Sequence, residues 1–312
     1  MRFVIFGTGG AGGYFGVQLA AAGQDVVFIA RGEHLKAIKA NGLRLEMPNG
    51  ETTIRAEATD DPSKVGTADA VLIGVKAWQV KDAAQAIRPV VGSQTIVVPL
   101  QNGVEAASDL SAVLGAQHVL GGLCGTFSFV AGPGHIRNMG GANFIRFGEQ
   151  DNRRTDRVER LRQVIAAAGV AAEAPPDITK ATWDKFLLVT SQSVGAVARA
   201  PLGVIRASPG TRSLIQRCAQ EALNVARARK VAMADTAVDD TLKFIDGIPP
   251  AATNSLQRDI AAGKPSELDY WNGAVVRLGR EAGVPTPGHT FIYDCLLPQE
   301  LRARGKADFQ RL

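Results

Sequence analysis

Short apolar runs alternate with amphipathic segments along roughly the first half of the chain. Residues 2–6 form an apolar run of strand length, and residues 14–22 repeat apolar positions at helical spacing until Gly23. The alternation continues with strands expected at 25–30, 70–75, 95–98 and 119–123 and helices at 78–87, 104–114 and 153–168. This order is typical of an α/β domain built on a doubly wound parallel sheet.

Two segments depart from that alternation and predict additional β structure. Residues 42–58 indicate an antiparallel hairpin that turns at Pro48-Asn49-Gly50, and residues 126–148 are also β-like, with a turn at Gly132-Pro133-Gly134. Residues 170–173 are a candidate for one further strand of the sheet.

The strand signal stops after Pro175-Pro176, and the remaining pattern is helical. We therefore expect two domains, an α/β domain over residues 1–175 and an all-α domain over residues 176–312. The helices expected in the second domain include 208–230 and 251–261, followed by one that is capped by Ser266 and runs to Gly283.

The composition of the chain indicates what kind of protein it is and what kind of ligand it binds. The chain has 312 residues, of which 46% are hydrophobic and 21% charged, enough for a core in each of two domains. The net charge of +5 comes without a block of like charges, so we expect a small anionic ligand rather than nucleic acid. There is no long apolar run and no cleavage pattern at the start, which predicts a cytoplasmic protein without a membrane partner.

The three cysteines, Cys124, Cys218 and Cys295, are far apart in the sequence. They lack CxxC or Cys/His ligand spacing, so we expect neither a disulfide framework nor a metal site.

A glycine-rich turn joins the first expected strand to the first expected helix. It is formed by Gly7, Thr8, Gly9, Gly10, Ala11 and Gly12. The GxGxxG spacing allows a tight turn, a close approach of the backbone to a pyrophosphate and close packing of helix on strand. A tight turn that binds no ligand is the alternative, but the strand before it and the helix after it favour a dinucleotide site.

The second strand ends at Ala30 and is followed by Arg31. An acidic residue there would accept the ribose 2′-hydroxyl of NAD, whereas a guanidinium suits a 2′-phosphate, so we expect NADP(H).

Lys76 and Asn102 follow two other strands, at the edge where ligands bind in open α/β sheets. Without other information, each is equally a surface lysine or a turn asparagine.

Two charged residues of the helical half stand in unusual surroundings. Lys185 lies between Trp183 and the apolar run 186–189, and burial there would lower the pKa of its ammonium towards that of a general acid. A lysine that extends its ammonium to water is the alternative. Glu267 would lie in the first turn of a helix, where a carboxylate also complements the helix dipole.

Five short segments in order carry a family resemblance. They are VKAWQV (75–80), QNGVE (101–105), WDK (183–185), SELDYWNG (266–273) and GVPTP (283–287), behind the N-terminal GxGxxG. Over about residues 1–300 the chain resembles ketopantoate reductase (2-dehydropantoate 2-reductase). The resemblance implies a Rossmann domain, an all-helical domain like that of 6-phosphogluconate dehydrogenase, and NADPH-dependent reduction of a 2-oxo acid. It also implies a role in pantothenate biosynthesis.

The resemblance assigns roles to residues of the candidate site. It implies that Lys185 is the catalytic lysine, that Glu267 binds the substrate hydroxyl, and that Ser255 binds substrate. It further implies that Asn102 lies beside the nicotinamide and substrate. Lys76 would follow the third parallel strand beside the cofactor, and Arg31 would meet the 2′-phosphate.

The sequence departs from the family's pattern beyond the lysine. Where the family usually has an amide four residues on, and often another at eight, this chain has Val189 and Ser193. Because i, i+4 and i+8 share a helix face, substrate contacts are expected to differ.

Three alternatives stay open from the sequence. The protein could be a reductase or dehydrogenase for another small oxo or hydroxy acid, or a non-catalytic NADP(H) sensor. A homodimer built on helices such as 208–230 is a further open alternative.

Overall fold

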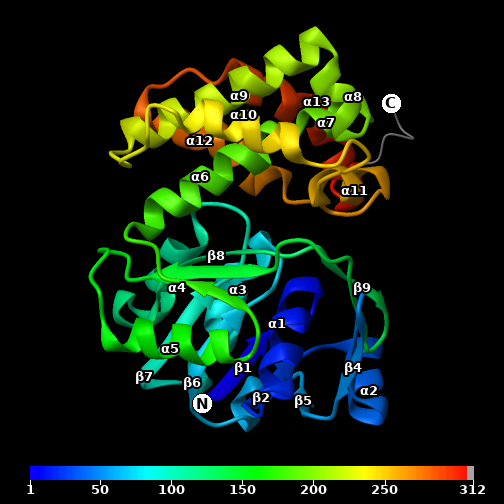
Figure 1. Cartoon of the computed structure of the whole chain (residues 1–312), viewed down its shortest axis with the longest axis vertical. Coiled ribbons are helices and arrows are strands. Elements are labelled where there is room, and N and C mark those ends of the chain that lie inside the picture. The colour runs from blue at the N-terminus through cyan, green and yellow to red at the C-terminus, as the bar shows by residue number, and fades with distance from the viewer. Residues whose placement is uncertain (308–312) are drawn as a thin grey trace. The chain divides into compact units, whose positions relative to one another are not determined.

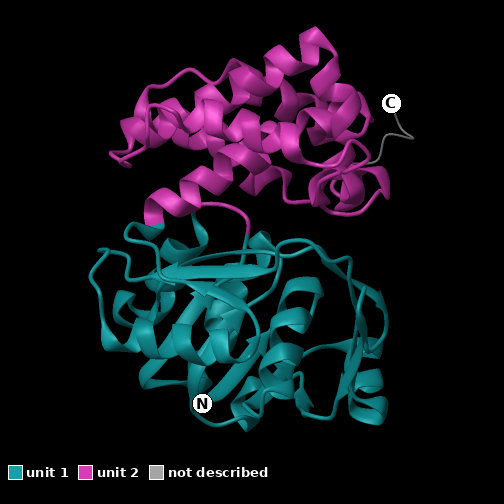
Figure 2. Ribbon diagram, in the orientation of Figure 1, with its two compact units in different colours: residues 1–101, 105–178 teal, residues 102–104, 179–312 magenta. Residues whose placement is uncertain are grey.

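The computed structural model describes residues 1–307, and this part of the chain forms two compact units (Figure 2). Unit 1 comprises residues 1–101 and 105–178, and unit 2 comprises residues 102–104 and 179–312. Each unit is described by itself.

Unit 1 is built on a five-stranded parallel sheet with the order β5-β2-β1-β6-β7 (Figure 1). Its strands are β1 (Arg2–Phe6), β2 (Asp25–Ile29), β5 (Glu57–Thr59), β6 (Ala68–Ile73) and β7 (Val91–Pro99). On the central strand β1, Phe3 and Ile5 face one apolar cluster, while Val4 and Phe6 face another. Both faces of this sheet are therefore covered, which explains the unbroken apolar run at the N-terminus.

Helices flank this sheet, and smaller sheets extend the unit. The helices are α1 (Gly10–Ala21), α2 (Gly32–Asn41), α3 (Val80–Ala86), α4 (Ala106–Leu114) and α5 (Asp156–Ala167). A four-stranded sheet has the order β4-β3-β10-β9, and a three-stranded sheet has the order β12-β11-β8. Their strands are β3 (Leu43–Met47), β4 (Gly50–Ile54), β8 (Gly121–Gly125), β9 (Ser128–Gly132), β10 (His135–Asn138), β11 (Phe144–Gly148) and β12 (Ala171–Glu173).

The expected hairpin at 42–58 is confirmed for β3 and β4, which pair antiparallel. The expected hairpin extended too far along the chain, because β5 is not part of it. β5 pairs parallel with β2 at the edge of the main sheet. Residues 119–123 and 170–173 were expected in the main sheet, but β8 and β12 belong to the three-stranded sheet.

Among the described residues of unit 2, all regular secondary structure is helical. Its helices are α6 (Ile178–Ser191, which begins at the last residue of unit 1), α7 (Val194–Ala198), α8 (Leu202–Ala207), α9 (Pro209–Ala228), α10 (Ala237–Gly247), α11 (Ser255–Ala261), α12 (Asn272–Ala282) and α13 (Pro287–Ala303). The expected fold class, a Rossmann-like α/β domain followed by an all-helical domain, is confirmed.

The helix expected to begin at Ser266 begins instead at Asn272. Between them lie a loop and the single turn η5 (Leu268–Tyr270). Ser266 is therefore not the cap of a long helix, and Glu267 does not lie in the first turn of one.

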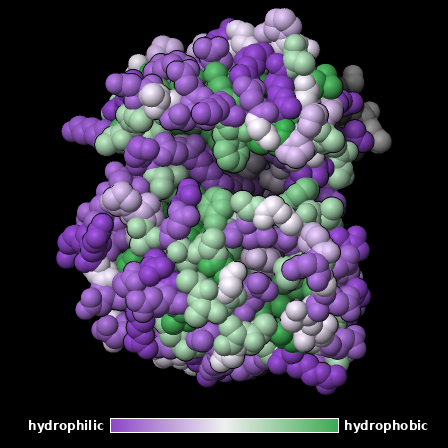
Figure 3. All heavy atoms as spheres, viewed as in Figure 1, coloured by the Kyte–Doolittle hydropathy of each residue, from purple (hydrophilic) through white to green (hydrophobic). Residues whose placement is uncertain are grey.

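On the face shown in Figure 3, hydrophobic residues are interspersed among hydrophilic ones. Among residues 1–307, every helix is too short or too polar to span a bilayer.

Candidate functional site

The glycine-rich turn lies where the order of the parallel strands reverses. β1 pairs with β2 on one side and with β6 on the other, so the turn after β1 opens at the switch point of the sheet. Gly7 has a φ of +97°, and a side chain on it would meet the backbone nitrogen of Val75 at 2.7 Å. A side chain on Gly12 would overlap the carbonyl oxygen of Gly7. The turn can therefore be this tight only with glycine at both positions.

The turn leaves room for a ligand at its tip. An added Cβ on Gly9, the residue that precedes α1, would meet no atom within 4 Å. Gly10 and Ala11 are in the first turn of the 12-residue helix α1. Their N–H groups belong to a helix N-terminus, which favours a bound anion. Thr8 links the turn to the end of β2, because its N–H and its hydroxyl both donate to the carbonyl of Ile29. These residues fit the pyrophosphate of a dinucleotide.

Arg31 and Lys76 lie beyond the carboxyl ends of β2 and β6, the two strands that flank β1. Arg31 is exposed and precedes α2, two residues after β2 ends. Lys76 follows β6, is half-buried, and lies 5.9 Å from the centre of the Trp78 ring. Both cations are therefore on the side of the sheet where a nucleotide would bind.

Gln101 is a buried residue of this region that the sequence did not single out. Its Nε2 donates to the carbonyls of Ile73 and Val75, each over 2.8 Å. The side chain thus fixes the end of β7, and with it the start of the Asn102 loop, to the loop that carries Lys76. Its place next to the Asn-Gly pair was the only signal available in the sequence.

Asn102 belongs with the helical unit, not with the sheet it follows. Residues 102–104 group with unit 2, where Gly103 has a φ of +136° and a Cβ added to it would lie 3.4 Å from the Tyr270 carbonyl oxygen. Val104 packs against the apolar cluster that contains Trp183 and Phe186. The residues that follow Asn102 therefore lie near Tyr270, Trp183 and Phe186. These three residues are close in sequence to Glu267 or to Lys185.

Lys185 is half-buried on α6, between the fully packed Trp183 and Phe186. The expectation that Ser193 shares its helix face is wrong. α6 ends at Ser191, the chain turns with a bond from the Ser193 N–H to the Thr190 carbonyl, and Ser193 is completely buried. Val189 remains on α6, one turn beyond Lys185.

Glu267 is 6% exposed and follows Ser266, which is held by Glu300 and Arg304. The N–H and hydroxyl of Ser266 both donate to Glu300 on α13, over 2.9 and 2.6 Å to Oε2. Arg304 donates to Glu300 over 2.6 Å and to the Ser266 carbonyl over 2.9 Å. We call Ser266, Glu300 and Arg304 the α13 clamp. Sequence reasoning missed it, because Glu300 and Arg304 lie 34 and 38 positions beyond Ser266 in the chain.

Ser255 is the first residue of α11 and is half-buried. The preceding Asn254 accepts a hydrogen bond from the Gln257 N–H over 2.7 Å and donates one to the Gln192 carbonyl over 3.0 Å. Because Gln192 follows α6 directly, Asn254 ties the start of α11 to the end of the helix that carries Lys185.

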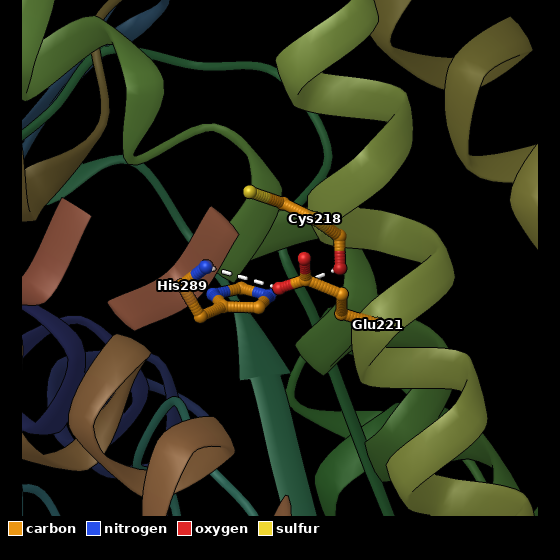
Figure 4. A group of neighbouring side chains, drawn as sticks. All are labelled: Cys218, Glu221 and His289. Carbon is orange, nitrogen blue, oxygen red and sulfur yellow. Dashed lines mark hydrogen bonds between the residues drawn. The ribbon is translucent and has the colours of Figure 1, made fainter. Parts of the chain in front are cut away.

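Cys218, Glu221 and His289 form a buried cluster whose ligand atoms lie within 4.8 Å of one another (Figure 4). Glu221 accepts the N–H groups of Gly288 and His289, at the start of α13. The His289 Nδ1 accepts from Asn272, and its Nε2 donates to the Cys218 carbonyl. Both ring nitrogens are thus engaged, so the cluster is a helix cap with no imidazole lone pair left for a metal. Burial lowers the pKa of His289 to about 4.

The structure divides the candidate residues between the units. Gly7 to Gly12, Arg31 and Lys76 lie in unit 1, whereas Asn102, Lys185, Ser255 and Glu267 lie in unit 2. The candidate nucleotide-binding residues and the candidate catalytic residues are thus each grouped within one unit.

Two family models match this chain, one over most of unit 1 and one over most of unit 2. The family model for the ketopantoate reductase PanE/ApbA matches residues 3–152, and the model for its C-terminal part matches residues 177–300. A 2-dehydropantoate 2-reductase of Mesorhizobium japonicum is 33% identical, over 92% of this chain and 94% of that protein. The crystal structure of a PanE/ApbA family ketopantoate reductase from Ralstonia eutropha has a TM-score of 0.88 and 34% identity, covering 97% of this chain and all of that one.

A protein of lower sequence identity shares the same fold. The ternary structure of D-mandelate dehydrogenase with NADH and anilino(oxo)acetate has a TM-score of 0.89 at 20% identity, covering 97% and 100% of the two chains. At that identity the likeness concerns the fold alone. The matches to both family models, together with the Ralstonia and Mesorhizobium relatives, show that this chain belongs to the ketopantoate reductase PanE/ApbA family of NAD(P)-dependent oxidoreductases.

Proposed function

We propose that the protein reduces a 2-oxo acid to a 2-hydroxy acid with NADPH, and that 2-dehydropantoate is the first substrate to test. The observation that carries this proposal is the grouping of Asn102, Lys185 and Glu267 in one compact unit. The segment 102–104 would otherwise be expected to stay with the sheet that it follows. A place in pantothenate biosynthesis follows if 2-dehydropantoate is the substrate.

Each residue has a role in this reaction. When bound, NADPH supplies the hydride to the carbonyl carbon, which oxidises the nicotinamide. Lys185 donates a proton to the carbonyl oxygen as negative charge develops there, so that the products are the hydroxy acid and NADP⁺. Glu267 accepts a hydrogen bond from the new hydroxyl or from the Lys185 ammonium. Asn102 helps to position the reacting groups, and the Ser255 hydroxyl binds the substrate carboxylate.

The proposed preference for NADPH over NADH rests on Arg31. No carboxylate occupies this position to accept a ribose 2′-hydroxyl, and the exposed guanidinium follows β2 where a 2′-phosphate would lie. We also propose a reducing, cytoplasmic location, because Cys124, Cys218 and Cys295 are all free thiols.

The test is steady-state oxidation of NADPH by 2-dehydropantoate, with wild type and Lys185→Ala. We expect wild-type turnover, and a loss of about 10² or more in kcat for the variant, which lacks the proton donor. Lys180→Ala, at another lysine of α6, is the matched control and should keep kcat near the wild-type value. Normal turnover by Lys185→Ala would remove this lysine from the mechanism.

A second candidate is the same reaction on another small oxo acid, and Val189 favours it because it places an apolar group one turn from Lys185. A panel of 2-oxo acids separates the two. Tight NADPH binding without turnover of any carbonyl compound would instead indicate a redox-sensing protein.

A further inference from the structure

The surface of α6 changes character at Lys185. The half-exposed residues on its N-terminal side include Thr182 and Asp184, which are polar, whereas those that follow it on the helix are Leu188 and Val189. Since residues three and four apart are neighbours on a helix, Leu188 and Val189 both lie beside Lys185. A group bound at the Lys185 ammonium would therefore have an apolar neighbour on the C-terminal side.

The polar residues of that part of α6 are turned inward. Thr190 and Ser191 are completely buried, and their hydroxyls donate to the carbonyls of Phe186 and Leu188, over 2.8 and 3.1 Å. Neither hydroxyl is available to a substrate. From Phe186 to Ser191, α6 thus presents only hydrocarbon on its accessible side.

The apolar surface is fixed in place. Leu188 and Val189 pack against the apolar cluster that contains Leu268 and Trp271, and Val189 also packs against the cluster that contains Trp183 and Phe186. A half-buried valine between two clusters cannot withdraw without opening a cavity. The surface that it offers is therefore a constant property of the site.

We infer that Val189 selects the substrate, and that it recognises the side chain of the 2-oxo acid by apolar contact and not by hydrogen bonding. The inference rests on the proposed function. The substrate class is then 2-oxo acids with a branched, apolar side chain, and a terminal hydroxyl on that side chain is tolerated but not required.

Two compounds that differ by one hydroxyl make this inference measurable. They are 2-dehydropantoate and 2-oxo-3,3-dimethylbutanoate, which is the same molecule without its terminal hydroxyl. A site built to hydrogen-bond a hydroxyl rejects the analogue that lacks it by about 10⁴ or more, whereas an apolar site discriminates weakly. The ratio of kcat/KM for the two compounds therefore reports the chemistry of the site.

The experiment measures that ratio with NADPH for wild type, Val189→Asn and Val197→Asn. We expect the wild-type ratio to lie within about tenfold of unity, and Val189→Asn to shift it by about tenfold or more towards 2-dehydropantoate. Val197 is a half-buried valine of α7 that packs on the same cluster, so Val197→Asn should leave the ratio unchanged. Circular dichroism confirms that each variant is folded.

The outcomes are distinguishable. If wild type reduces neither compound nor any other 2-oxo acid, the proposed function itself fails. If wild type reduces 2-dehydropantoate more than about 10³-fold better than the analogue, the function stands and the inference is overturned. An unchanged ratio in folded Val189→Asn, or an equal shift in Val197→Asn, overturns the role of Val189.

Discussion

Ser266 donates its hydroxyl hydrogen bond to Glu300 across 2.6 Å, and this bond ties the loop that carries Glu267 to the last turns of α13. Glu300 is 1% exposed, and Arg304 completes the clamp as its charged partner. The carboxylate of Glu300 is thus buried with a cation and two donors, an arrangement in which the loss of one partner is costly.

Glu300→Gln is expected to weaken the α13 clamp without emptying its volume. The variant keeps an oxygen acceptor but leaves Arg304 without its anion, so we expect a loss of about 1–3 kcal/mol in unfolding free energy. Because Glu267 follows Ser266, kcat should also fall while KM for NADPH stays constant. Denaturant unfolding and steady-state kinetics measure these effects. Asp294→Asn, at an exposed carboxylate of α13, is the control, and an unchanged kcat in Glu300→Gln would show that the clamp is structural only.

Arg31→Asp is expected to reverse the choice of cofactor. An acidic side chain repels a 2′-phosphate and can accept a ribose hydroxyl, so kcat/KM with NADPH should fall by about tenfold to a hundredfold while that with NADH is kept or improved. Initial rates with both cofactors measure the change. Lys39→Ala, at an exposed cation of α2, should alter neither rate. A wild type that already prefers NADH would contradict the assignment of Arg31.

His289 is expected to make stability depend on pH in the acidic range. Its pKa falls from 6.5 in the unfolded chain to about 4 in the fold, because burial disfavours the charged ring. The unfolded state therefore binds more protons as the pH drops below about 6.5, and stability falls until about pH 4, by about 3 kcal/mol at most. Urea unfolding across this range measures the slope. His289→Gln should flatten it and His118→Gln should retain it, while equal slopes in wild type and His289→Gln would contradict the prediction.

Thiol titration should separate the three cysteines. Cys295 is exposed, whereas Cys124 and Cys218 are buried. Burial and the nearby Glu221 carboxylate raise the pKa of Cys218 to about 12, so little of its reactive thiolate forms. An aromatic disulfide reagent should modify one thiol per folded chain rapidly and all three after unfolding. Cys295→Ser should remove the rapid phase, and a second rapid thiol in the wild type would disprove the assignment.

The local features of the sequence predicted the fold class, and the roles of the candidate site residues stay predictions. The glycine turn and Arg31 could be placed because each depends on the strand immediately before it. Ser193 was misplaced because periodicity cannot show where a helix ends, and here the hydroxyls of Thr190 and Ser191 bond back into α6 just before the chain turns.

Ser266 shows the other reason for failure. It has the residue type of a helix cap, but a carboxylate 34 positions away takes its hydroxyl. Such a partner is invisible to any reading of local sequence. Gln101 and Asn254 escaped notice for the same reason, since each bonds to backbone carbonyls that are remote in the chain.

The polypeptide passes between the two units three times, on either side of residues 102–104 and again after residue 178. A protease that cuts after residue 178 therefore leaves the fragments interlinked, because Val104 remains embedded in helical packing that its own fragment does not encode. A gene for residues 179–312 alone would produce a helical bundle with one of its apolar contacts missing. The helical unit is therefore complete only when it includes residues 102–104, which come from the N-terminal half of the sequence.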